Sequence, residues 1–369
     1  MVELVAKASA LAGQLSPAVQ LSVGDLVRSM NCYYSNLIEG HHTHPRDIDR
    51  ALADKYSKNP EKRVLQEEAR AHIEVQRQID HGEAPFEEPV SEKYIRWLHR
   101  EFYARVPDEL RWVEDPDTGA RLEVIPGEFR TGGVQVGQHI PPDASELGHF
   151  LARFSEVYAS ERLSRTRYLI AAGAAHHRLL WIHPFYDGNG RVARLLSHAM
   201  LLKAGIGTST WSIARGLARN VESYKQLLTL ADQPRQGDVD GRGALSEKAL
   251  MKFCRFFFQV CIDQVTFMES LLQPSELLRR MKLYVDDEVA AGRLPKGSLS
   301  LLREALLAGE VARGKAAELT GYRERRGRQI LSTLLEKRLL MSQGPRAPVH
   351  VGFPIDVVER WFPQLYPVT

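Results

Sequence analysis

The sequence predicts a mainly α-helical protein that contains one short β-hairpin and ends in a helix-turn-helix followed by a second hairpin. Three observations support this prediction. Over most of the chain, apolar residues recur at the spacing of helices, and alternating stretches are few. Glycine pairs and alternating valines gather in residues 127–142, the most strand-like segment. From about residue 274 the composition changes, and two helical stretches flank Gly321.

The same observations divide the chain into three regions. Residues 1–110 are predicted to form an N-terminal helical region, residues 111–273 a helical core with the hairpin, and residues 274–369 a C-terminal domain. A chain of 369 residues is long enough for two or three domains, each with its own core.

Bulk composition sets limits on the function. Hydrophobic residues make up 44% and charged residues 26% of the chain, which are ordinary proportions for a soluble globular protein. The net charge of +3 does not by itself indicate a nucleic-acid or membrane partner. The three cysteines have no metal-ligand spacing, which suits a reducing compartment. There is no basic segment typical of a signal peptide and no apolar run of about 18 residues, so we expect a cytoplasmic protein without a membrane partner.

The N-terminal region contains a helix that is predicted to end at Gly40, because glycine is common just after a helix. Ser35 and Glu39 are four residues apart and share one face of this helix. Glu39 then lies in the last turn, where the helix dipole disfavours an anion. An acid in that place gains from a nearby cation, and Arg194 is the candidate. Residues 60–80 carry charges of alternating sign, which is typical of an exposed amphipathic helix.

The run from His183 to Arg194 gathers groups that suit phosphate chemistry. His183 is of the residue type that accepts a proton near neutral pH. Asp187 offers the carboxylate oxygen that Mg²⁺ prefers, usually together with substrate phosphates. The glycine-rich turn that follows leads into a predicted helix, whose free N–H groups and dipole make an anion site. The residues of this turn are Gly188, Asn189 and Gly190.

Two arginines extend the predicted anion site. Arg191 and Arg194 are three residues apart, so both project to one side of the first helical turn and can reach different phosphates. The run is not a Walker A loop, because GxxxxGK[ST] is absent. Its residue types therefore predict a polyphosphate-binding turn with a base beside it.

The run resembles the signature of the Fic family, HPFx(D/E)GNGRxxR, and matches it at every fixed position. Ser35-Asn-Leu-Ile-Glu39-Gly40 is similar to the inhibitory motif of that family, (S/T)xxxE(G/N). The resemblance implies a Fic-type helical bundle with a β-hairpin flap. Most members of the family transfer AMP from ATP to a hydroxyl group of a target protein.

The resemblance also implies roles for single residues. His183 would be the general base, and Asp187 would hold Mg²⁺. Glu39 would pair with Arg194 and displace the γ-phosphate from its productive position. The residues implied to bind phosphates are Gly188, Asn189, Gly190, Arg191 and Arg194, with Asn189 at the α-phosphate and the arginines at the β- and γ-phosphates. The residues implied to dock the target in the flap are Val134, Gln135 and Val136, and a plain surface hairpin is the alternative for this segment.

Three further residues have less specific signals. Asn220 and Tyr224 are four residues apart and are expected to face the nucleotide base, as similarly placed residues do in relatives, or else to pack in the core. His176 lies seven residues before His183, but the sequence has no HxxxH or HExxH metal motif there. We therefore expect His176 to be a hydrogen-bonded core histidine.

The C-terminal domain is predicted to be a winged helix, because a helix-turn-helix precedes a hairpin. Between residues 310 and 338 there are eight basic and four acidic residues, which leaves a local charge of +4. Such a charge permits contact with DNA phosphates. Many winged helices bind only proteins or form dimers, so DNA and a homodimer are both open as partners.

These observations predict a self-inhibited protein adenylyltransferase that uses ATP and Mg²⁺. Its acceptor would be a Ser, Thr or Tyr hydroxyl of a target protein, and the chain itself is among the candidate targets. Two alternatives stay open. The enzyme could instead remove AMP, with Glu39 orienting a water molecule, or the chain could be a DNA-binding transcription regulator whose Fic core senses a nucleotide.

Overall fold

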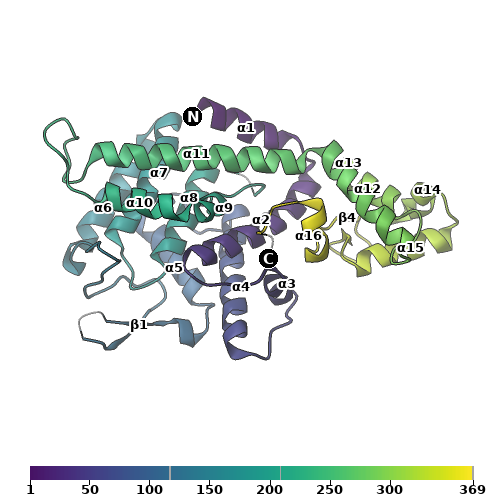
Figure 1. Cartoon of the computed structure of the whole chain (residues 1–369), viewed down its shortest axis with the longest axis horizontal. Coiled ribbons are helices and arrows are strands. Elements are labelled where there is room, and N and C mark those ends of the chain that lie inside the picture. Colours follow the sequence, from purple (N-terminus) through teal and green to yellow (C-terminus); the bar gives the residue numbers. More distant parts are fainter. Residues whose placement is uncertain (116–117, 208, 368–369) are drawn as a thin grey trace. The chain divides into compact units, whose positions relative to one another are not determined.

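The computed structural model describes residues 1–115, 118–207 and 209–367, which are mainly α-helical, as the sequence predicts (Figure 1). The chain forms two compact units. The core unit consists of Met1–Val5, Asn31–Thr208 and Ser212–Gln264, and the C-terminal unit of Ala6–Met30, Ser209–Trp211 and Val265–Thr369. Residues 31–110, which the sequence places in an N-terminal region, thus belong to the same unit as the signature run.

Among the described residues, eleven α-helices contribute to the core unit. They are α1 (Val2–Gly13), α2 (Pro17–Ile38), α3 (Pro45–Leu52), α4 (Pro60–Asp80), α5 (Glu92–Tyr103), α6 (Leu147–Tyr158), α7 (Arg165–Ile182), α8 (Asn189–Lys203), α9 (Ala214–Arg219), α10 (Val221–Ala231) and α11 (Glu247–Leu272). Short 3₁₀ turns lie at Asp108–Leu110, Ala144–Glu146 and Ser160–Arg162. Among the described residues, no helix is both long and apolar enough to cross a membrane.

Several helices begin at residues whose side chains cap them. Asn59 accepts a hydrogen bond from the backbone N–H of Lys62 at 3.1 Å, and Pro60 follows as the first residue of α4. Ser91 caps α5 in the same way, with its hydroxyl 3.2 Å from the N–H of Tyr94. Such caps satisfy N–H groups that have no partner within the helix, so the local sequence defines where these helices start.

Helices α7 and α8 pack closely at the centre of the core unit. The buried face of α7 includes Ala171, Ala172, Gly173 and Ala175, whose small side chains allow close approach of neighbouring helices. A Cβ atom on Gly173 would lie only 3.4 Å from the ring of Phe257 in α11. Helix α8 is buried over almost its whole length. The loop between these two helices is therefore held from both ends by the core.

Helix α4 differs from its prediction as an exposed amphipathic helix. It buries a broad face whose members are Gln66, Glu68, Ala69, Ala71, His72, Ile73, Val75, Gln76 and Ile79. Helices α3, α5 and α8 pack against it. Glu68 and Gln76 on this face pair with Arg191 and Asn31, which lie far away in the chain, and local charge alternation does not reveal these contacts.

The prediction of a small antiparallel hairpin is confirmed, but the strands lie earlier than the sequence suggests. Strand β1 (Trp112–Glu114) pairs with β2 (Arg121–Glu123), with Val113 opposite Leu122. Within residues 127–142 the only β pairing among described residues is a single bridge between Val136 and His139. Gly127 and Gly137 have positive φ angles of 82° and 59°, so the glycines turn the backbone rather than extend it.

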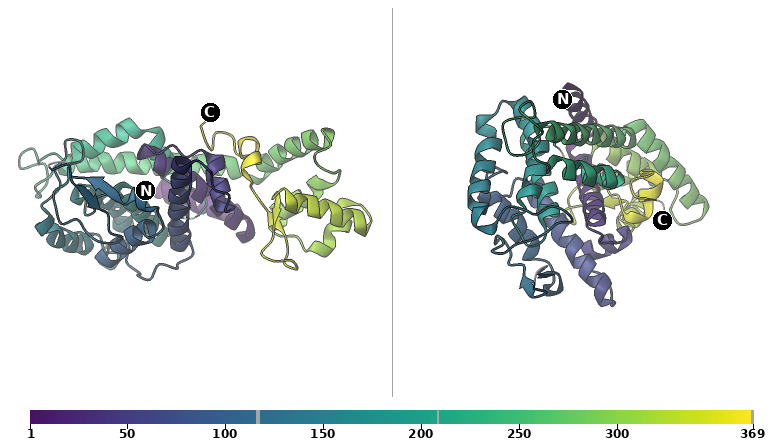
Figure 2. Two further views of the ribbon diagram at one scale, coloured as in Figure 1. Left: turned by 90° about the horizontal axis from the view of Figure 1, so that it is seen from below. Right: turned by 60° about the vertical axis from the view of Figure 1, so that its left-hand side comes forward.

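The C-terminal unit contains further short elements. They are α12 (Pro274–Ala290), α13 (Ser298–Ala308), a 3₁₀ turn (Arg313–Lys315), α14 (Ala316–Thr320), α15 (Glu324–Glu336), β3 (Leu340–Met341), β4 (His350–Val351) and α16 (Ile355–Trp361). Gly321, with φ 71°, joins α14 to α15, and Leu340 pairs with Val351 in the hairpin. The segment from α12 to the C-terminus is drawn in light green to yellow in Figure 2. This is the order of elements from which the sequence predicts a winged helix. Its assignment to the winged-helix class stays a prediction.

Candidate active site

The loop between α7 and α8 has a left-handed residue at each end. His183 is the C-cap of α7 with φ 49°, and Gly188 is the N-cap of α8 with φ 78°. Asn189 closes the loop, because its Oδ1 accepts from the N–H of Phe185 at 3.0 Å and its Nδ2 donates to the carbonyl of Phe185 at 2.8 Å. The side chain of Asn189 is thus engaged in shaping the loop.

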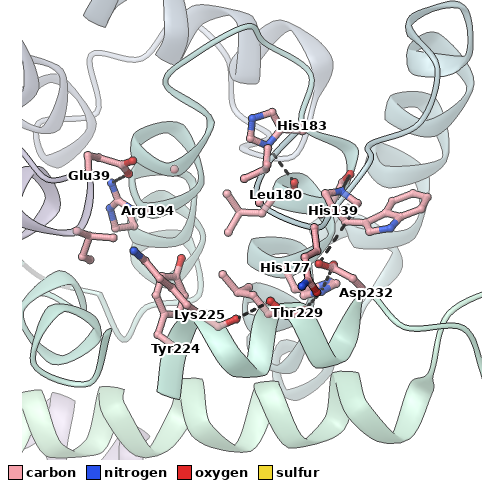
Figure 3. Close-up of a pocket in the computed structure, with 17 residues that line it drawn as sticks. Glu39, His139, His177, Leu180, His183, Arg194, Tyr224, Lys225, Thr229 and Asp232 are labelled. Atoms are coloured by element: carbon pink, nitrogen blue, oxygen red, sulfur yellow. Dashed lines mark hydrogen bonds and ion pairs between the residues drawn. The ribbon is translucent and has the colours of Figure 1, made fainter. Parts of the chain in front are cut away.

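His183 is held as a neutral base. Its Nδ1 lies 3.3 Å from the carbonyl oxygen of Leu180, which only accepts, so Nδ1 carries the proton. Nε2 then keeps its lone pair, and the ring lines a cavity (Figure 3). Burial lowers the pKa of His183 to about 4, so the ring is unprotonated at neutral pH.

Arg194 is a buried cation that lines this cavity. Its Nε donates to the hydroxyl of Ser35 at 2.8 Å, and its Nη2 donates to the Ser35 carbonyl at 3.2 Å. Nη2 also donates to Oε1 of Glu39 at 2.5 Å (Figure 3). The side chain of Arg194 is buried, whereas that of Glu39 is partly exposed.

The Glu39 carboxylate covers the first turn of α8. A Cβ atom on Gly190 would collide with Oε1 of Glu39. Burial opposes the charge on Glu39, but Arg194 and Arg191 outweigh it and lower the pKa of this carboxyl. An ionised acid of the chain therefore occupies the place where the helix N-terminus would attract another anion.

Arg191 does not line the cavity beside Arg194. Its guanidinium donates to the carboxylate of Glu68 on α4 and lies 5.3 Å from the ring centroid of Phe102. His41 also contacts Glu68, with its Nδ1 2.8 Å from Oε2, and this contact raises the pKa of His41. Arg191 and Glu68 are both buried. The structure thus pairs Arg191 with Glu68, and the phosphate contact that the resemblance implies for Arg191 stays a prediction.

Asp187 is the one carboxylate of the loop. Its Oδ2 accepts from the hydroxyl of Tyr103 at 2.6 Å, and burial together with the Asp187 charge raises the pKa of that tyrosine. Among the described residues there is no group of three or more His, Cys, Asp or Glu that could hold a metal ion. A single carboxylate nevertheless fits Mg²⁺, which is often bound by one or two carboxylates together with phosphates and water.

The cavity has a volume of about 560 Å³, which is within the usual range for small-molecule sites. Glu39 and Arg194 lie at one side of it, His183 lies apart from them, and Asp232 lies at the far side with His139 and His177 (Figure 3). The remaining lining residues are Ile38, Val136, Gly137, Gln138, Leu180, Trp181, Gly190, Tyr224, Lys225, Leu228 and Thr229.

The two residues expected at a nucleotide base have different positions. Tyr224 lines the cavity, but its hydroxyl is 2.7 Å from Nε2 of His176. Asn220 is exposed, does not line the cavity, and donates to the carbonyl of Gly216 at 2.8 Å. His176 is a buried, hydrogen-bonded core histidine as predicted, and burial lowers its pKa to about 3.

Sequence reasoning identified Tyr224 but missed the other residues in and just after α10 that line the cavity. Leu228 follows Tyr224 by four positions and Asp232 follows by four more, a spacing that places all three on one helix face. This spacing is the signal that would have identified them.

Arg130 was also missed. Its Nε donates to the carbonyl of His183 at 2.8 Å, and its Nη1 donates to the carbonyl of Gly132 at 2.9 Å. Arg130 is buried, and it ties the segment 130–132 to the loop that follows α7. No local pattern in the sequence indicates this contact.

The segment expected to dock a target contributes only part of its predicted residues to the cavity. Val136 lines the cavity and is 44% exposed. Gln135 donates to the carbonyl of Gly137 at 2.9 Å, and neither it nor Val134 is among the lining residues.

Residues 89–201 match the model of the Fic/DOC family. Proteins named "Protein adenylyltransferase Fic" from Drosophila erecta and Drosophila melanogaster are each 46% identical to this chain over 79 residues. That match covers 21% of this chain and 16% of each relative, so the chain aligns with less than a fifth of their length.

Two solved structures share the fold. A Fic family protein from Desulfovibrio desulfuricans G20 superposes with a TM-score of 0.53 at 17% identity, and the match covers 95% of each chain. A Fic domain containing signaling protein from Bacteroides thetaiotaomicron superposes with a TM-score of 0.52 at 21% identity, covering 72% of this chain and 93% of that one. At these identities the likeness concerns the fold alone.

Proposed function

We propose that this chain, which contains a Fic domain, is a self-inhibited protein adenylyltransferase that transfers AMP from ATP to a Ser, Thr or Tyr hydroxyl of a target protein. The observation that carries the proposal is one cavity that joins the neutral base His183, Gly190 at the start of α8, and Arg194. The printed name of the relatives, protein adenylyltransferase, supports the same activity.

The reaction follows from the position of His183. Nε2 takes the proton of the target hydroxyl while the hydroxyl oxygen attacks the α-phosphorus of ATP. A new oxygen–phosphorus bond forms, the bond from the α-phosphorus to the bridging oxygen breaks, and pyrophosphate leaves. The contact of Nδ1 with the Leu180 carbonyl keeps the ring in the tautomer that this step needs.

The phosphates of ATP would bind at the first turn of α8. Free N–H groups of that turn, the positive end of the helix dipole and Arg194 supply the attraction. Asp187 would hold Mg²⁺ on the phosphates through the oxygen that Tyr103 does not use. Bound Mg²⁺ would offset the negative charge that develops on the pyrophosphate leaving group. Asn189 acts in this scheme mainly by fixing the shape of the turn.

Self-inhibition would come from competition for Arg194. The Glu39 carboxylate already accepts from Nη2 of Arg194 and lies over Gly190. A γ-phosphate needs the same donors, so ATP binds productively only when Glu39 moves away.

We propose that the target protein docks on the segment around Val136, at the edge of the cavity. Val136 is partly exposed at the edge of the cavity, and its bridge to His139 leaves short stretches of backbone that can pair with an extended peptide. We assign Val134, Gln135 and Val136 to this role as neighbours along that edge.

The experiment that tests the proposal uses wild type, Glu39→Gly and His183→Ala, each incubated with Mg²⁺ and ATP labelled at the α-phosphate. Label on protein is read by gel and mass spectrometry, with the chain itself and a cell lysate as acceptors. We expect strong labelling with Glu39→Gly, weak labelling with wild type and none with His183→Ala. Absence of label with all three, although ATP binds, would refute the transferase proposal.

A second candidate function is DNA binding by the C-terminal unit, and one observation favours it. Helix α15 buries Gly327, Ile330, Leu331 and Leu334, and its opposite face is exposed. The exposed arginines at the start of this helix are Arg323, Arg325, Arg326 and Arg328. A second helix of a helix-turn-helix that presents cations at its N-terminal end fits the phosphates and major groove of a duplex.

A further inference from the structure

A second cavity is lined by residues of α6, of α7 and of the loop before α11, and the proposed chemistry does not use it. We call it the α6–α7 cavity. Its apolar wall includes Phe150, Phe154, Trp181, Ile182 and Leu245. Its volume of about 340 Å³ is at the lower end of the usual range for small-molecule sites. All of its lining residues belong to the core unit, so this cavity is a property of that unit alone.

Residue spacing explains how two walls of the α6–α7 cavity form. Phe150 and Phe154 are four residues apart, so they share one face of α6. Arg178, Trp181 and Ile182 are separated by three and then one residue, which places them on one face of α7. The rings of Phe150 and Trp181, with centroids 5.3 Å apart, join the two faces. The result is an aromatic wall with a cation on the α7 side.

The loop before α11 forms the third wall. Leu245 in this loop forms a β bridge with Pro234. Asp240 accepts hydrogen bonds from the backbone N–H groups of Gln236 and Lys248, each at 2.8 Å. These contacts hold the loop in place without a ligand, so the cavity is preformed. A preformed site loses little conformational entropy when a ligand binds.

Arg178 is the cation of the α7 wall. Its Nη1 donates to Nδ1 of His177 at 3.1 Å and lies 3.5 Å from the carbonyl oxygen of Ala231. Because Nδ1 of His177 accepts, that ring is neutral. Asp232 attracts Arg178 but pairs with His177 at 3.0 Å. Within the part of the chain that the structure describes, no carboxylate forms an ion pair with Arg178.

A cation at the edge of an apolar space favours an anionic ligand. Burial lowers the pKa of Arg178, and the neighbouring Tyr158 and Asp232 oppose this shift only in part. A bound anion would offset the cost of the half-buried charge. A guanidinium has further N–H donors on Nε and Nη2, which match the two oxygens of a carboxylate. The lining also includes Arg153, but its side chain is 63% exposed and already pairs with Glu156 at 2.8 Å.

We propose that the α6–α7 cavity binds a small apolar carboxylate, whose charged group pairs with Arg178 and whose body packs against Phe154 and Trp181. This inference does not depend on the proposed transferase function. One guanidinium balances a monoanion, whereas the additional charge of a phosphate would stay unbalanced beside apolar walls. Aromatic acids and medium-chain fatty acids both have the required chemistry.

Trp181 provides a spectroscopic signal for occupancy. It lines both the α6–α7 cavity and the active-site cavity, and it directly precedes Ile182 and His183. A ligand body against the indole changes the polarity around it. We therefore expect the tryptophan emission of the chain to shift on binding, and we expect Trp181→Phe to remove this shift while binding persists.

The test combines calorimetry and tryptophan emission on the full chain. The probes are hydrocinnamate and octanoate, an aromatic and an aliphatic carboxylate, and their uncharged analogues hydrocinnamyl alcohol and octanol. We expect each carboxylate to bind at least about tenfold more tightly than the alcohol with the same body, because hydrogen bonds between charged groups are stronger than neutral ones. The tighter of the two carboxylates shows whether an aromatic or an aliphatic body is preferred.

Two variants and a control locate the binding. Arg178→Met removes the charge but keeps an unbranched side chain, so it should abolish the preference for the carboxylate over the alcohol. Val157→Trp, at a lining position that is 37% exposed, should fill the cavity and weaken binding of every probe. Arg167→Met, at an exposed position of α7 outside the cavity, is the control and should change neither. Circular dichroism establishes that each variant is folded.

Several results would overturn the proposal. Equal affinities for carboxylate and alcohol in wild type, or an unchanged preference in folded Arg178→Met, would remove the role of Arg178. Undiminished binding by Val157→Trp would place the ligand outside this cavity. Absence of both heat and emission change with every probe would mean that the cavity takes no apolar carboxylate. None of these results bears on AMP transfer, which the labelling experiment tests separately.

Discussion

Nη2 of Arg194 donates a hydrogen bond to Oε1 of Glu39 at 2.5 Å, although the two residues are 155 positions apart in the chain. Ser35, one turn before Glu39, contacts the same guanidinium through its hydroxyl and its carbonyl. The end of α2 and the first turn of α8 are thus joined by one buried arginine. Arg194 thus supplies the cation that stabilises Glu39 at the end of α2. The Glu39 carboxylate in turn covers the N-terminal turn of α8.

The first prediction concerns Glu39→Gly. Removal of the carboxylate frees Arg194 and uncovers Gly190, so we expect the initial rate of AMP transfer to rise by at least about tenfold, equivalent to roughly 1.4 kcal/mol. The measurement is the rate of label incorporation at fixed ATP and Mg²⁺. Glu222→Gln, an exposed acid in the first turn of α10, is the control and should leave the rate unchanged. A rate for Glu39→Gly at or below that of wild type would contradict inhibition.

The second prediction concerns His183→Ala. General-base catalysis contributes about 10²- to 10⁴-fold, so we expect transfer in the Glu39→Gly background to fall by that factor. Nucleotide affinity should stay within about threefold, because we propose that the phosphates bind to α8 and Arg194 rather than to the imidazole. Single-turnover labelling and calorimetry measure the two quantities. If transfer persisted at the parental rate, another group would have to be the base.

The third prediction concerns pH. A base works only when unprotonated, and burial lowers the pKa of His183 to about 4 from an ordinary value of about 6.5. The rate of Glu39→Gly should therefore be flat between about pH 8 and pH 5.5 and fall only as the pH approaches 4. The profile is recorded where circular dichroism shows a native fold. If the transfer rate instead fell with a midpoint near pH 6.5, the pKa of His183 would be that of a hydrated imidazole, and burial would not lower it.

Local sequence was enough to predict the loop of the site. His183, Asp187 and Gly190 lie on one loop and the start of one helix, so their spacing largely determines how they lie together. The base and the anion site that we propose at α8 depend on residue types at short range. The order of elements in the C-terminal unit is local in the same way, since Gly321 marks the turn between α14 and α15.

The errors arose where long-range contacts decide the structure. Helix α4 looked like an exposed helix from its charges, but it buries Glu68, which pairs with Arg191. Residues 127–142 looked like a hairpin, but positive φ angles at Gly127 and Gly137 turn the chain. A short stretch of neighbouring residues does not predict that Glu68 is buried, and it does not predict the path of residues 127–142.

The fourth prediction concerns DNA. If α15 contacts duplex phosphates, the full chain should bind a labelled duplex, and the logarithm of the affinity should fall linearly with the logarithm of salt concentration. Arg325→Gln with Arg326→Gln should reduce that slope by about 2, one for each lost phosphate contact. Arg279→Gln, an exposed arginine of α12, is the control. Fluorescence anisotropy without binding at about 0.1 M salt would exclude the DNA-binding candidate.

The fifth prediction concerns the buried acid of α4. Glu68 is 1% and Arg191 is 4% exposed, and His41 contacts the same carboxylate. Removing one partner of a buried ion pair leaves an uncompensated charge and commonly costs about 3–5 kcal/mol. We expect Glu68→Gln to lower the free energy of unfolding of the core unit by about 3 kcal/mol, because the amide still accepts one hydrogen bond. Urea denaturation followed by circular dichroism measures this loss.

Glu67 gives the matched control for Glu68, since it is the preceding residue of the same helix. It pairs with Arg63 at 2.8 Å on the surface, where side chains are 26% and 59% exposed. An exposed pair of this kind contributes less than about 1 kcal/mol, so Glu67→Gln should leave the midpoint of denaturation almost unchanged. If both variants lowered the free energy of unfolding by similarly small amounts, water would have to reach Arg191, and Glu68 would not be what holds Arg191 in place. A large loss for Glu68→Gln alone would show that α4 supports the first turn of α8 from behind.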